Sequence, residues 1–346
     1  MTTMQAAIFD TAAEPLRLAE VDRPTPAAHE VLLRVAACGV CGSDLHATAD
    51  DDGIARNGGI LGHEVTGHIA ELGADVTGWS VGDQVYVMPI GSCGSCPRCL
   101  LGEPEQCPDQ LTFGALGDDQ PDGAYAEFVV CSATDLLAVP EGLSLDVAAL
   151  VEPLATGLLC VRRADLDIGD RVLVIGAGPI GLSAALFARF FGARRVVVSD
   201  FLDHRLELAT ELGATDVING RNVDDVRDAF IELTGAPPDV VIEAVGRPGM
   251  LNEAIRLVGD GGRVVTGGVC MEPDSFDHLA AYGREPTIQT ARTYTFAENE
   301  FILEMIAAGR IDPSPMISHR ISLDELPAAF DALRTPTDQC KVMVVP

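Results

Sequence analysis

A glycine-rich turn between two apolar segments constrains the fold more than any other feature of the sequence. The stretch RVLVIGAGPIGLSAALFARFFGARRVVVSD, residues 171–200, contains a GxGxxG motif at Gly176, Gly178 and Gly181. An apolar run precedes the motif and a helix-like run follows it, so we expect a buried strand, a tight turn and a buried helix. Glycine and proline interrupt the uncharged residues 172–188 early, which favours this reading over a membrane-spanning helix.

The sequence alternates between strand-like and helix-like patterns after about residue 154. This alternation predicts a parallel sheet covered by helices, as in a Rossmann doubly wound domain, and we assign this α/β domain to residues 155–294. The expected strands are residues 171–175, 195–199, 216–218, 239–242 and 263–266.

The rest of the chain lacks this alternation. Residues 1–154 contain short β-rich runs separated by glycine, which predicts a mainly β domain rich in loops. Residues 295–346 contain a helix pattern, with Phe301, Ile302, Met305 and Ile306 on one face, and a closing strand, KVMVVP. We expect this C-terminal segment to return to the first domain.

The GxGxxG turn also indicates a dinucleotide-binding site. Its glycines allow a tight turn and let a pyrophosphate approach the backbone at a helix N-terminus. Asp200 ends the next expected strand, where a carboxylate can bind the ribose hydroxyls of NAD and repel the 2′-phosphate of NADP. Arg205 lies close enough to accept that phosphate, but NAD is favoured. The expected cofactor-binding residues are Gly176, Gly178, Pro179, Ile180, Gly181, Asp200 and Arg205.

A second group of residues has the chemistry of a metal site. The stretch ACGVCGSDLH supplies Cys41, Ser43 and His46, and GILGHEVTGH supplies His63 and Glu64. Thiolate and imidazole are usual zinc ligands, and a catalytic zinc site keeps one position open. From spacing alone, Cys41 could equally be a buried thiol and His63 a core histidine.

Four cysteines form a third cluster, in GSCGSCPRCLLGEPEQC. Cys93, Cys96, Cys99 and Cys107 superficially resemble an iron–sulfur run, but seven residues separate the last two, where a bacterial ferredoxin run has three. Four thiolates close a zinc tetrahedron completely and leave no position for a substrate. We therefore expect a structural zinc site, and visible absorbance would instead indicate an iron–sulfur cluster.

The charge of the chain excludes several partners. The 23 basic and 52 acidic residues leave a formal charge of −29, which repels nucleic acid and anionic membranes. Lys341 is the only lysine, and the other basic residues are arginine. The N-terminal residues do not pair a charged segment with an apolar one, so we expect a cytoplasmic protein that acts on a small molecule.

Taken together, these motifs resemble those of the zinc-dependent medium-chain dehydrogenases. The residues that carry the resemblance are Gly62-His63-Glu64, Cys41-Gly42-Ser43-Asp44-Leu45-His46, the four spaced cysteines and the GxGxxG turn. The chain looks closest to the polyol (sorbitol-like) and L-threonine dehydrogenase branch. The resemblance implies a GroES-like catalytic domain at residues 1–154, a Rossmann NAD-binding domain, and a dimer or tetramer of identical chains.

The resemblance also implies roles for individual residues. Cys41 and His63 would bind a catalytic zinc ion, with Glu152 of VEPLATG where the alcohol dehydrogenase branch has a cysteine; Glu64 would approach this ion or bind it transiently. Ser43 would take the proton of a substrate hydroxyl, and His46 would pass it to solvent. Thr156 would lie near the nicotinamide and Arg292 near the substrate. The four cysteines would hold a structural zinc, giving two zinc ions per chain.

These features predict an NAD-dependent zinc oxidoreductase acting on the secondary alcohol of a polyol, sugar, cyclitol or amino alcohol. One alternative is a biosynthetic ketone or imine reductase that uses NAD(P)H on the same scaffold. Another is a non-catalytic structural protein that retains the fold.

Overall fold

The protein, seen in a computed structural model, divides into two units. The structure describes residues 2–12, 14–50, 53–114, 116–117, 119–335 and 338–346. The first unit contains Met1–Glu152, Thr295–Arg310 and Ile317–Pro346, and the second contains Pro153–Tyr294 and Ile311–Met316.

The second unit is built on a parallel sheet with strand order β13-β12-β11-β14-β15-β16. The strands are β11 (Arg171–Ile175), β12 (Arg195–Asp200), β13 (Asp216–Asn219), β14 (Val240–Glu243), β15 (Arg263–Thr266) and β16 (Thr287–Thr290). The first five confirm the expected strands, and the arrangement confirms the α/β fold class. The order reverses between β11 and β14, the point at which ligands bind in open sheets of this kind.

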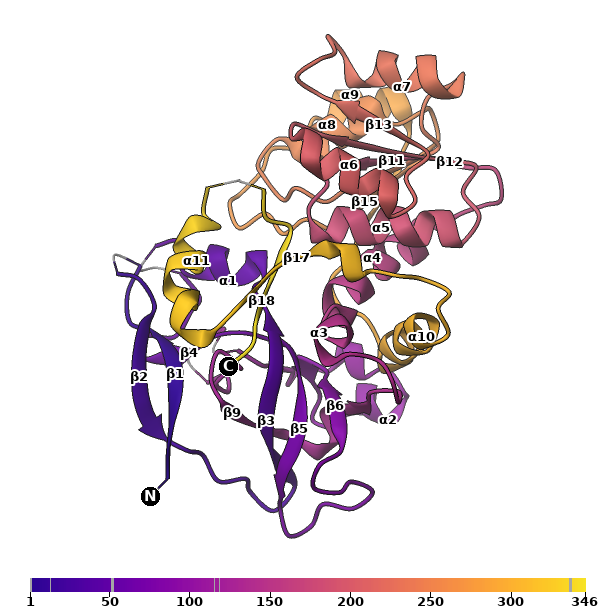
Figure 1. The fold of residues 1–346 in the computed structure, drawn as a ribbon. Coiled ribbons are helices and arrows are strands. Elements are labelled where there is room, and N and C mark those ends of the chain that lie inside the picture. Colours follow the sequence, from indigo (N-terminus) through magenta and orange to yellow (C-terminus); the bar gives the residue numbers. More distant parts are fainter. Residues whose placement is uncertain (1, 13, 51–52, 115, 118, 336–337) are drawn as a thin grey trace. The chain divides into compact units, whose positions relative to one another are not determined.

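Helices surround this sheet (Figure 1). They are α4 (Val151–Arg163), whose first two residues belong to the first unit, α5 (Pro179–Phe190), α6 (Asp203–Glu211), α7 (Val226–Thr234), α8 (Met250–Leu257), α9 (His278–Arg284) and the 3-10 helix η3 (Ser314–Met316). Helix α5 is buried along most of its length, and all but the first residue of β11 are buried, so the uncharged sequence segment is a core strand and helix. Among the described residues, no helix is long and apolar enough to cross a membrane.

The first unit is mainly β. Its largest sheet has the order β10-β6-β5-β3-β18-β17, with β9 also paired to β3, and β2-β1-β4 and β7-β8 form smaller sheets. The strands are β1 (Thr3–Phe9), β2 (Arg17–Asp22), β3 (Glu30–Gly39), β4 (Gly59–Ile60), β5 (Glu64–Leu72), β6 (Gln84–Val87), β7 (Ile90–Gly91), β8 (Leu111–Thr112), β9 (Phe128–Ser132), β10 (Leu136–Ala138), β17 (Ile317–Ile321) and β18 (Lys341–Val344).

Short helices complete the first unit. They are α1 (Gly42–Ala47), α2 (Pro97–Leu100), α3 (Leu145–Ala148), α10 (Phe296–Ala307), α11 (Leu326–Ala332) and the 3-10 helices η1 (Pro104–Gln106), η2 (Ala133–Asp135) and η4 (Leu323–Glu325). Ile302 and Ile306 of α10 are buried, in keeping with the apolar face seen in the sequence.

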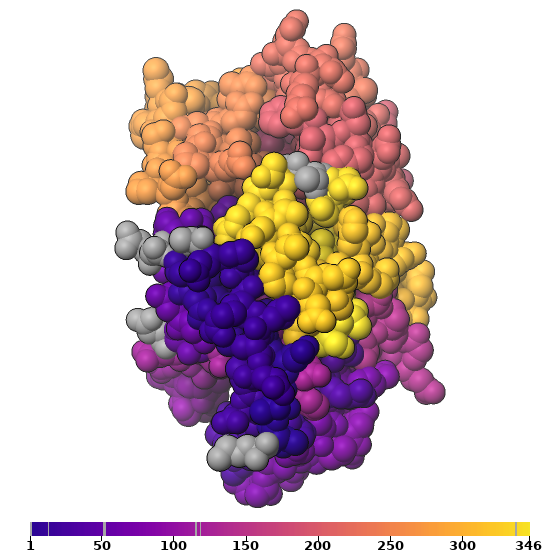
Figure 2. All heavy atoms as spheres, turned by 60° about the vertical axis from the view of Figure 1, so that its left-hand side comes forward, coloured from indigo at the N-terminus to yellow at the C-terminus, as the bar shows by residue number. Residues whose placement is uncertain are grey.

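The C-terminal residues lie against the N-terminal part of the first unit. In Figure 2 the yellow C-terminal segment lies beside the indigo N-terminal segment, and Arg334 donates a hydrogen bond to the carbonyl of Leu45 at 3.1 Å. Strand β18 pairs with β3 and places Met343 opposite Gly39. The last strand of the chain therefore lies directly beside the segment that leads into α1.

Candidate metal and cofactor sites

Four side chains of the first unit converge on one point. Cys41, His63, Glu64 and Glu152 each offer a ligand atom, and these atoms lie within 4.8 Å of one another. Cys41 precedes α1, and Glu152 lies in the first turn of α4. His63 immediately precedes β5, and Glu64 is its first residue. Pairing of β3 with β5 brings the first three together, because Gly39 at the end of β3 stands opposite Glu64.

The imidazole of His63 is oriented by a buried carboxylate. Its Nδ1 lies 3.2 Å from Oδ1 of Asp44, and Asp44 also accepts a hydrogen bond from the Tyr125 hydroxyl at 2.6 Å. Burial would raise the pKa of Asp44, but His63 and the hydrogen bonds hold it below its ordinary value. Carboxylates commonly fix metal-binding histidines in this way, leaving Nε2 as the ligand atom.

Ser43 lies next to the proposed ligands. Its hydroxyl donates to Sγ of Cys41 at 3.1 Å and lies 3.4 Å from Nε2 of His63. His46 lies three residues further along the same helix, α1, and its side chain is exposed. The Ser43 hydroxyl therefore lies at the metal cluster, and the exposed His46 lies on the same helix; their roles in proton transfer stay predictions.

Glu64 occupies a space that a glycine leaves open. Its carboxylate is fully buried, and a Cβ added at Gly39 would lie 2.0 Å from its Oε2. Oε1 accepts a hydrogen bond from Nζ of Lys341 at 2.5 Å, whereas Oε2 has no hydrogen-bond partner in the described part of the chain. A buried carboxylate oxygen without a partner is costly, so this oxygen fits a cation. The donor set of one thiolate, one imidazole and two carboxylates fits zinc.

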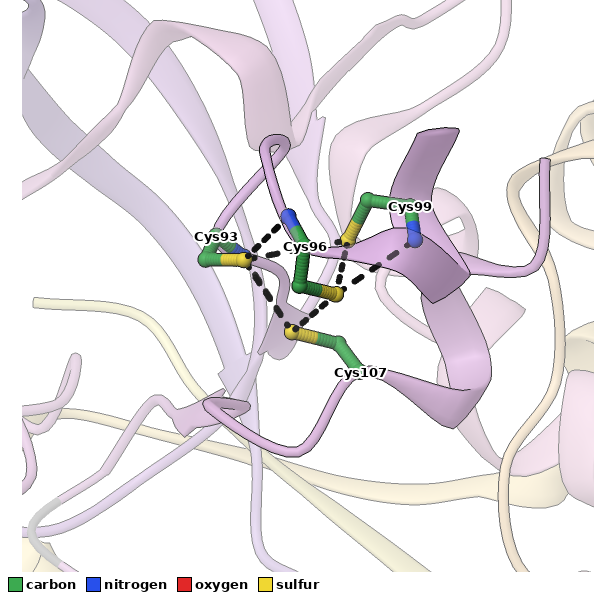
Figure 3. A group of neighbouring side chains, drawn as sticks. All are labelled: Cys93, Cys96, Cys99 and Cys107. Carbon is green, nitrogen blue, oxygen red and sulfur yellow. Dashed lines mark hydrogen bonds between the residues drawn. The ribbon is translucent and has the colours of Figure 1, made fainter. Parts of the chain in front are cut away.

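The four cysteines of the second cluster also lie together (Figure 3). Their Sγ atoms are separated by 3.5 Å for Cys96 and Cys99, 3.5 Å for Cys93 and Cys107, 3.9 Å for Cys96 and Cys107, and 4.0 Å for Cys93 and Cys99. All four are free cysteines. A tetrahedral zinc with Zn–S bonds of about 2.3 Å places its sulfurs about 3.8 Å apart, so these separations suit a zinc ion.

Backbone amides support the thiolate form of this cluster. The N–H of Cys96 donates to Sγ of Cys93 at 3.3 Å, and the N–H of Cys99 donates to Sγ of Cys96 at 3.4 Å. The amides of Ser95 and Cys96 lower the pKa of the Cys93 thiol to about 6. The amide of Cys93 lowers the pKa of Cys107, but burial and the neighbouring thiols have the opposite effect and raise it to about 11. Thiolates are the form that binds metal, so of these two cysteines Cys93 is the one whose surroundings favour that form.

The glycine-rich turn of the second unit has the geometry expected for a phosphate-binding loop. Gly176 has a φ of +95°, and a Cβ at Gly181 would lie 1.8 Å from the carbonyl oxygen of Gly176, so neither position accepts another residue easily. The space beside Gly178 is open, and Pro179 begins α5. The first amides of α5 therefore lie where a phosphate can approach.

Asp200 is tied to this loop. Its Oδ2 accepts from the N–H of Ala177 at 2.7 Å, and its Oδ1 accepts from the N–H groups of Phe201 at 2.7 Å and Leu202 at 3.0 Å. The carboxylate is therefore fixed beside the GxGxxG turn. Arg205 follows on α6, and its Nε is buried without a hydrogen-bond partner among the described residues.

The remaining expected site residues also belong to the second unit. Ile180 follows Pro179 in α5, Thr156 lies on α4, and Arg292 lies between β16 and α10 with its side chain exposed. Contacts of Thr156 and Arg292 with nicotinamide and substrate stay predictions.

Comparison with known proteins identifies the family. Residues 27–141 match the family model "Alcohol dehydrogenase GroES-like domain", and residues 179–308 match "Zinc-binding dehydrogenase". The chain is 32% identical over 333 residues to an L-threonine 3-dehydrogenase of Xanthomonas campestris pv. campestris (strain B100), covering 95% of this chain and 96% of that protein. It is 31% identical over 355 residues to the sorbitol dehydrogenase of Bacillus subtilis (strain 168), covering 99% and 97%.

A solved structure agrees with this result. A zinc-binding dehydrogenase of Sinorhizobium meliloti 1021, bound to NADP, superposes with a TM-score of 0.89 at 30% sequence identity, with 100% of each chain covered. The chain belongs to the zinc-dependent medium-chain dehydrogenase family. It is an alcohol oxidoreductase by descent, and its two ligand clusters agree with the two zinc sites expected from the sequence.

Three residues near the first cluster were given no role in the sequence analysis. Asp44 belongs to the CGSDLH motif and directly follows Ser43. Its position in the sequence does not indicate that its carboxylate contacts His63. Tyr125 and Lys341 are separated from the motif by many residues, and the fold brings Tyr125 to Asp44 and Lys341 to Glu64. The one available signal for Lys341 was its being the only lysine of the chain.

Proposed function

We propose that this protein is an NAD-dependent zinc enzyme that transfers hydride between NAD(H) and the secondary alcohol of a polyol, sugar, cyclitol or amino alcohol. The observation that carries the proposal is the convergence of Cys41, His63, Glu64 and Glu152 within 4.8 Å, with the Ser43 hydroxyl beside them. Zinc held there would supply Lewis-acid polarisation of a substrate oxygen.

The choice of substrate class is supported by Glu152 and by the relatives. A carboxylate at this position is the feature in which the chain resembles the polyol branch and not the simple alcohol dehydrogenases. Relatives named for L-threonine and sorbitol both act on hydroxyl-bearing carbons of polar substrates, as their names state. Arg292 is our candidate for contacting such a polar substrate.

Different residues of the first unit would transfer the substrate proton and orient the metal ligand. Ser43, beside Cys41 and His63, would accept the proton of the substrate hydroxyl as it releases its own, and the exposed His46 on the same helix is our candidate to pass a proton to solvent. Asp44 keeps His63 in one orientation through its contact with Nδ1. Burial of His63, Glu64 and Asp44 excludes water and strengthens the local electrostatics.

The enzyme assay that tests this proposal is a screen of NAD reduction over polyols, cyclitols, sugars and amino alcohols, with and without a chelator. We expect chelator-sensitive NADH formation with at least one vicinal diol or amino alcohol. Oxidation of NADH or NADPH by ketones or imines without the reverse reaction would favour the reductase alternative. Complete inactivity of a protein that contains two zinc ions per chain would contradict both.

The position of Asp200 predicts cofactor preference. The variant Asp200→Asn places an amide where the Ala177 amide now donates to a carboxylate, and it removes the charge that repels a 2′-phosphate. Hydrogen bonds to charged groups contribute about 1.5–3 kcal/mol, so we expect KM for NAD to rise roughly 10- to 100-fold and the preference over NADP to fall.

The matched control is Asp260→Asn, since Asp260 is an exposed carboxylate of the same unit that pairs with Arg284. It should leave both kinetic constants near wild type. An unchanged KM for NAD and an unchanged NAD-to-NADP ratio in Asp200→Asn would refute the assignment of Asp200.

A further inference from the structure

The only lysine of the chain is buried in the wall of the metal cluster. Lys341 is 1% exposed. The other 22 of the 23 lysine and arginine residues of the chain are arginine. Burying an ammonium group is costly unless it is paired and hydrogen-bonded. The compact ammonium of lysine acts as a point charge, whereas the planar guanidinium of arginine needs more space. Lys341 therefore places a compact cation in a confined, buried position.

Three neighbouring strands bring Lys341 to its partner. Lysine begins β18, Glu64 begins β5, and β3 lies between these two strands. Gly39 has no side chain at the end of β3, and this leaves room for the Glu64 carboxylate, whose Oε2 would lie 2.0 Å from a Cβ at that position. Nζ donates to Oε1 of Glu64 at 2.5 Å and to the carbonyl oxygen of Val40 at 2.9 Å. Val40 immediately precedes the candidate ligand Cys41.

The two carboxylate oxygens of Glu64 are thereby made different. Oε1 accepts a hydrogen bond from Lys341, while Oε2 is buried without a hydrogen-bond partner in the described residues. A second carboxylate, that of Glu152, belongs to the same cluster. With a divalent ion in place, the charges of the ion, the Cys41 thiolate, the two carboxylates and the Lys341 ammonium cancel.

We propose that Lys341 is a positioning residue for the metal site, which holds Oε1 of Glu64 so that Oε2 is the oxygen available to the metal. The same ammonium compensates the second carboxylate and allows both glutamates to stand beside one ion. The inference rests on the proposed function, because it takes the cluster of Cys41, His63, Glu64 and Glu152 to be the catalytic metal site.

The experiment compares Lys341→Met, Glu64→Gln, the double variant and Arg320→Met. Arg320 is a half-exposed cation of the same unit that pairs with Asp146, so it controls for the loss of a positive charge. Zinc per chain is measured after competition with a graded chelator, the visible spectrum is recorded for the Co²⁺-substituted protein, and thermal unfolding is followed in parallel. Lys341→Gln, which removes the charge but can still donate a hydrogen bond to Glu64, is the second variant if Lys341→Met does not fold; it should still weaken metal binding, because the charge of the second carboxylate is then uncompensated.

We expect Lys341→Met to bind the metal of this cluster about 10- to 100-fold more weakly, as is typical for loss of a group that supports a metal ligand, and to alter the Co²⁺ spectrum. The zinc of the four cysteines should be retained. In the Glu64→Gln background, adding Lys341→Met should change neither quantity further, because the lysine acts through Glu64. Arg320→Met should match the wild type.

A buried ion pair that only stabilises the fold predicts a different result. Lys341→Met would then melt at a lower temperature but keep wild-type metal affinity and an unchanged Co²⁺ spectrum, and this would overturn the inference alone. An equal loss of affinity in the presence and absence of Glu64 would overturn it as well. Wild-type protein that binds metal only at the four cysteines would overturn the proposed function and the inference together.

Discussion

The variant His63→Ala is expected to lower kcat/KM at least about a thousandfold and to contain one zinc ion per chain in place of two, since Lewis-acid stabilisation contributes several kcal/mol. His63 is 6% exposed, and its Nε2 lies beside Cys41 and Ser43. Alanine removes the imidazole of this donor set and leaves one thiolate and two carboxylates, those of Glu64 and Glu152. Elemental analysis and steady-state kinetics on the purified protein measure both effects.

A matched variant separates this effect from the general loss of a histidine. His319 is an exposed residue of β17 in the same unit, and His319→Ala should retain both metal ions and full turnover. His63→Ala also removes the contact at Oδ1 of the buried Asp44 carboxylate, which keeps its hydrogen bond from Tyr125, so a lower melting temperature should accompany the loss of metal. Two zinc ions per chain together with unchanged turnover in His63→Ala would contradict the assignment.

The parts of the fold that the sequence predicted are those with a local signal. Strands β11 to β15 are short apolar runs between turns, and each was expected within one or two residues of its observed bounds. Strand β16 was not expected, because Thr287–Thr290 is polar and largely exposed at the edge of the sheet. An edge strand buries little, so its sequence need not carry an apolar pattern.

The same distinction applies to the metal cluster. Cys41, His63 and Glu64 stand in short motifs whose residue types already indicate metal chemistry, and Glu152 was found through the resemblance to a family. The contacts of Asp44 with His63, of Tyr125 with Asp44 and of Lys341 with Glu64 depend on how the chain folds and on burial. A sequence pattern does not show which distant residues come into contact, so these groups could be identified only from the folded chain.

The four-cysteine loop is the second place where removal of a metal should have a large effect. Residues 93–107 contain only α2 and the 3-10 helix η1, and Leu100 and Leu101 are 75% and 73% exposed. Cys107 is the only core residue that the described part of this loop contributes. The loop therefore buries too little apolar surface to be ordered by packing. Structural zinc sites bind with apparent free energies of about 10–16 kcal/mol, which is ample to order such a loop.

We accordingly expect Cys96→Ser to lose one zinc ion per chain and to become sensitive to proteolysis within residues 93–107, while the zinc bound at Cys41, His63 and Glu152 is retained. Serine keeps the size of the side chain but provides a poor zinc ligand, so the sulfur contacts at 3.5 Å to Cys99 and 3.9 Å to Cys107 are lost.

Cys270→Ser, which changes an exposed thiol of the second unit, is the matched control and should resist the protease as the wild type does. Cleavage outside this loop, or wild-type resistance in Cys96→Ser, would show that packing and not metal orders the segment. Visible charge-transfer absorbance of the wild-type protein as purified would instead identify an iron–sulfur cluster, since Zn²⁺ has a filled d shell and contributes none.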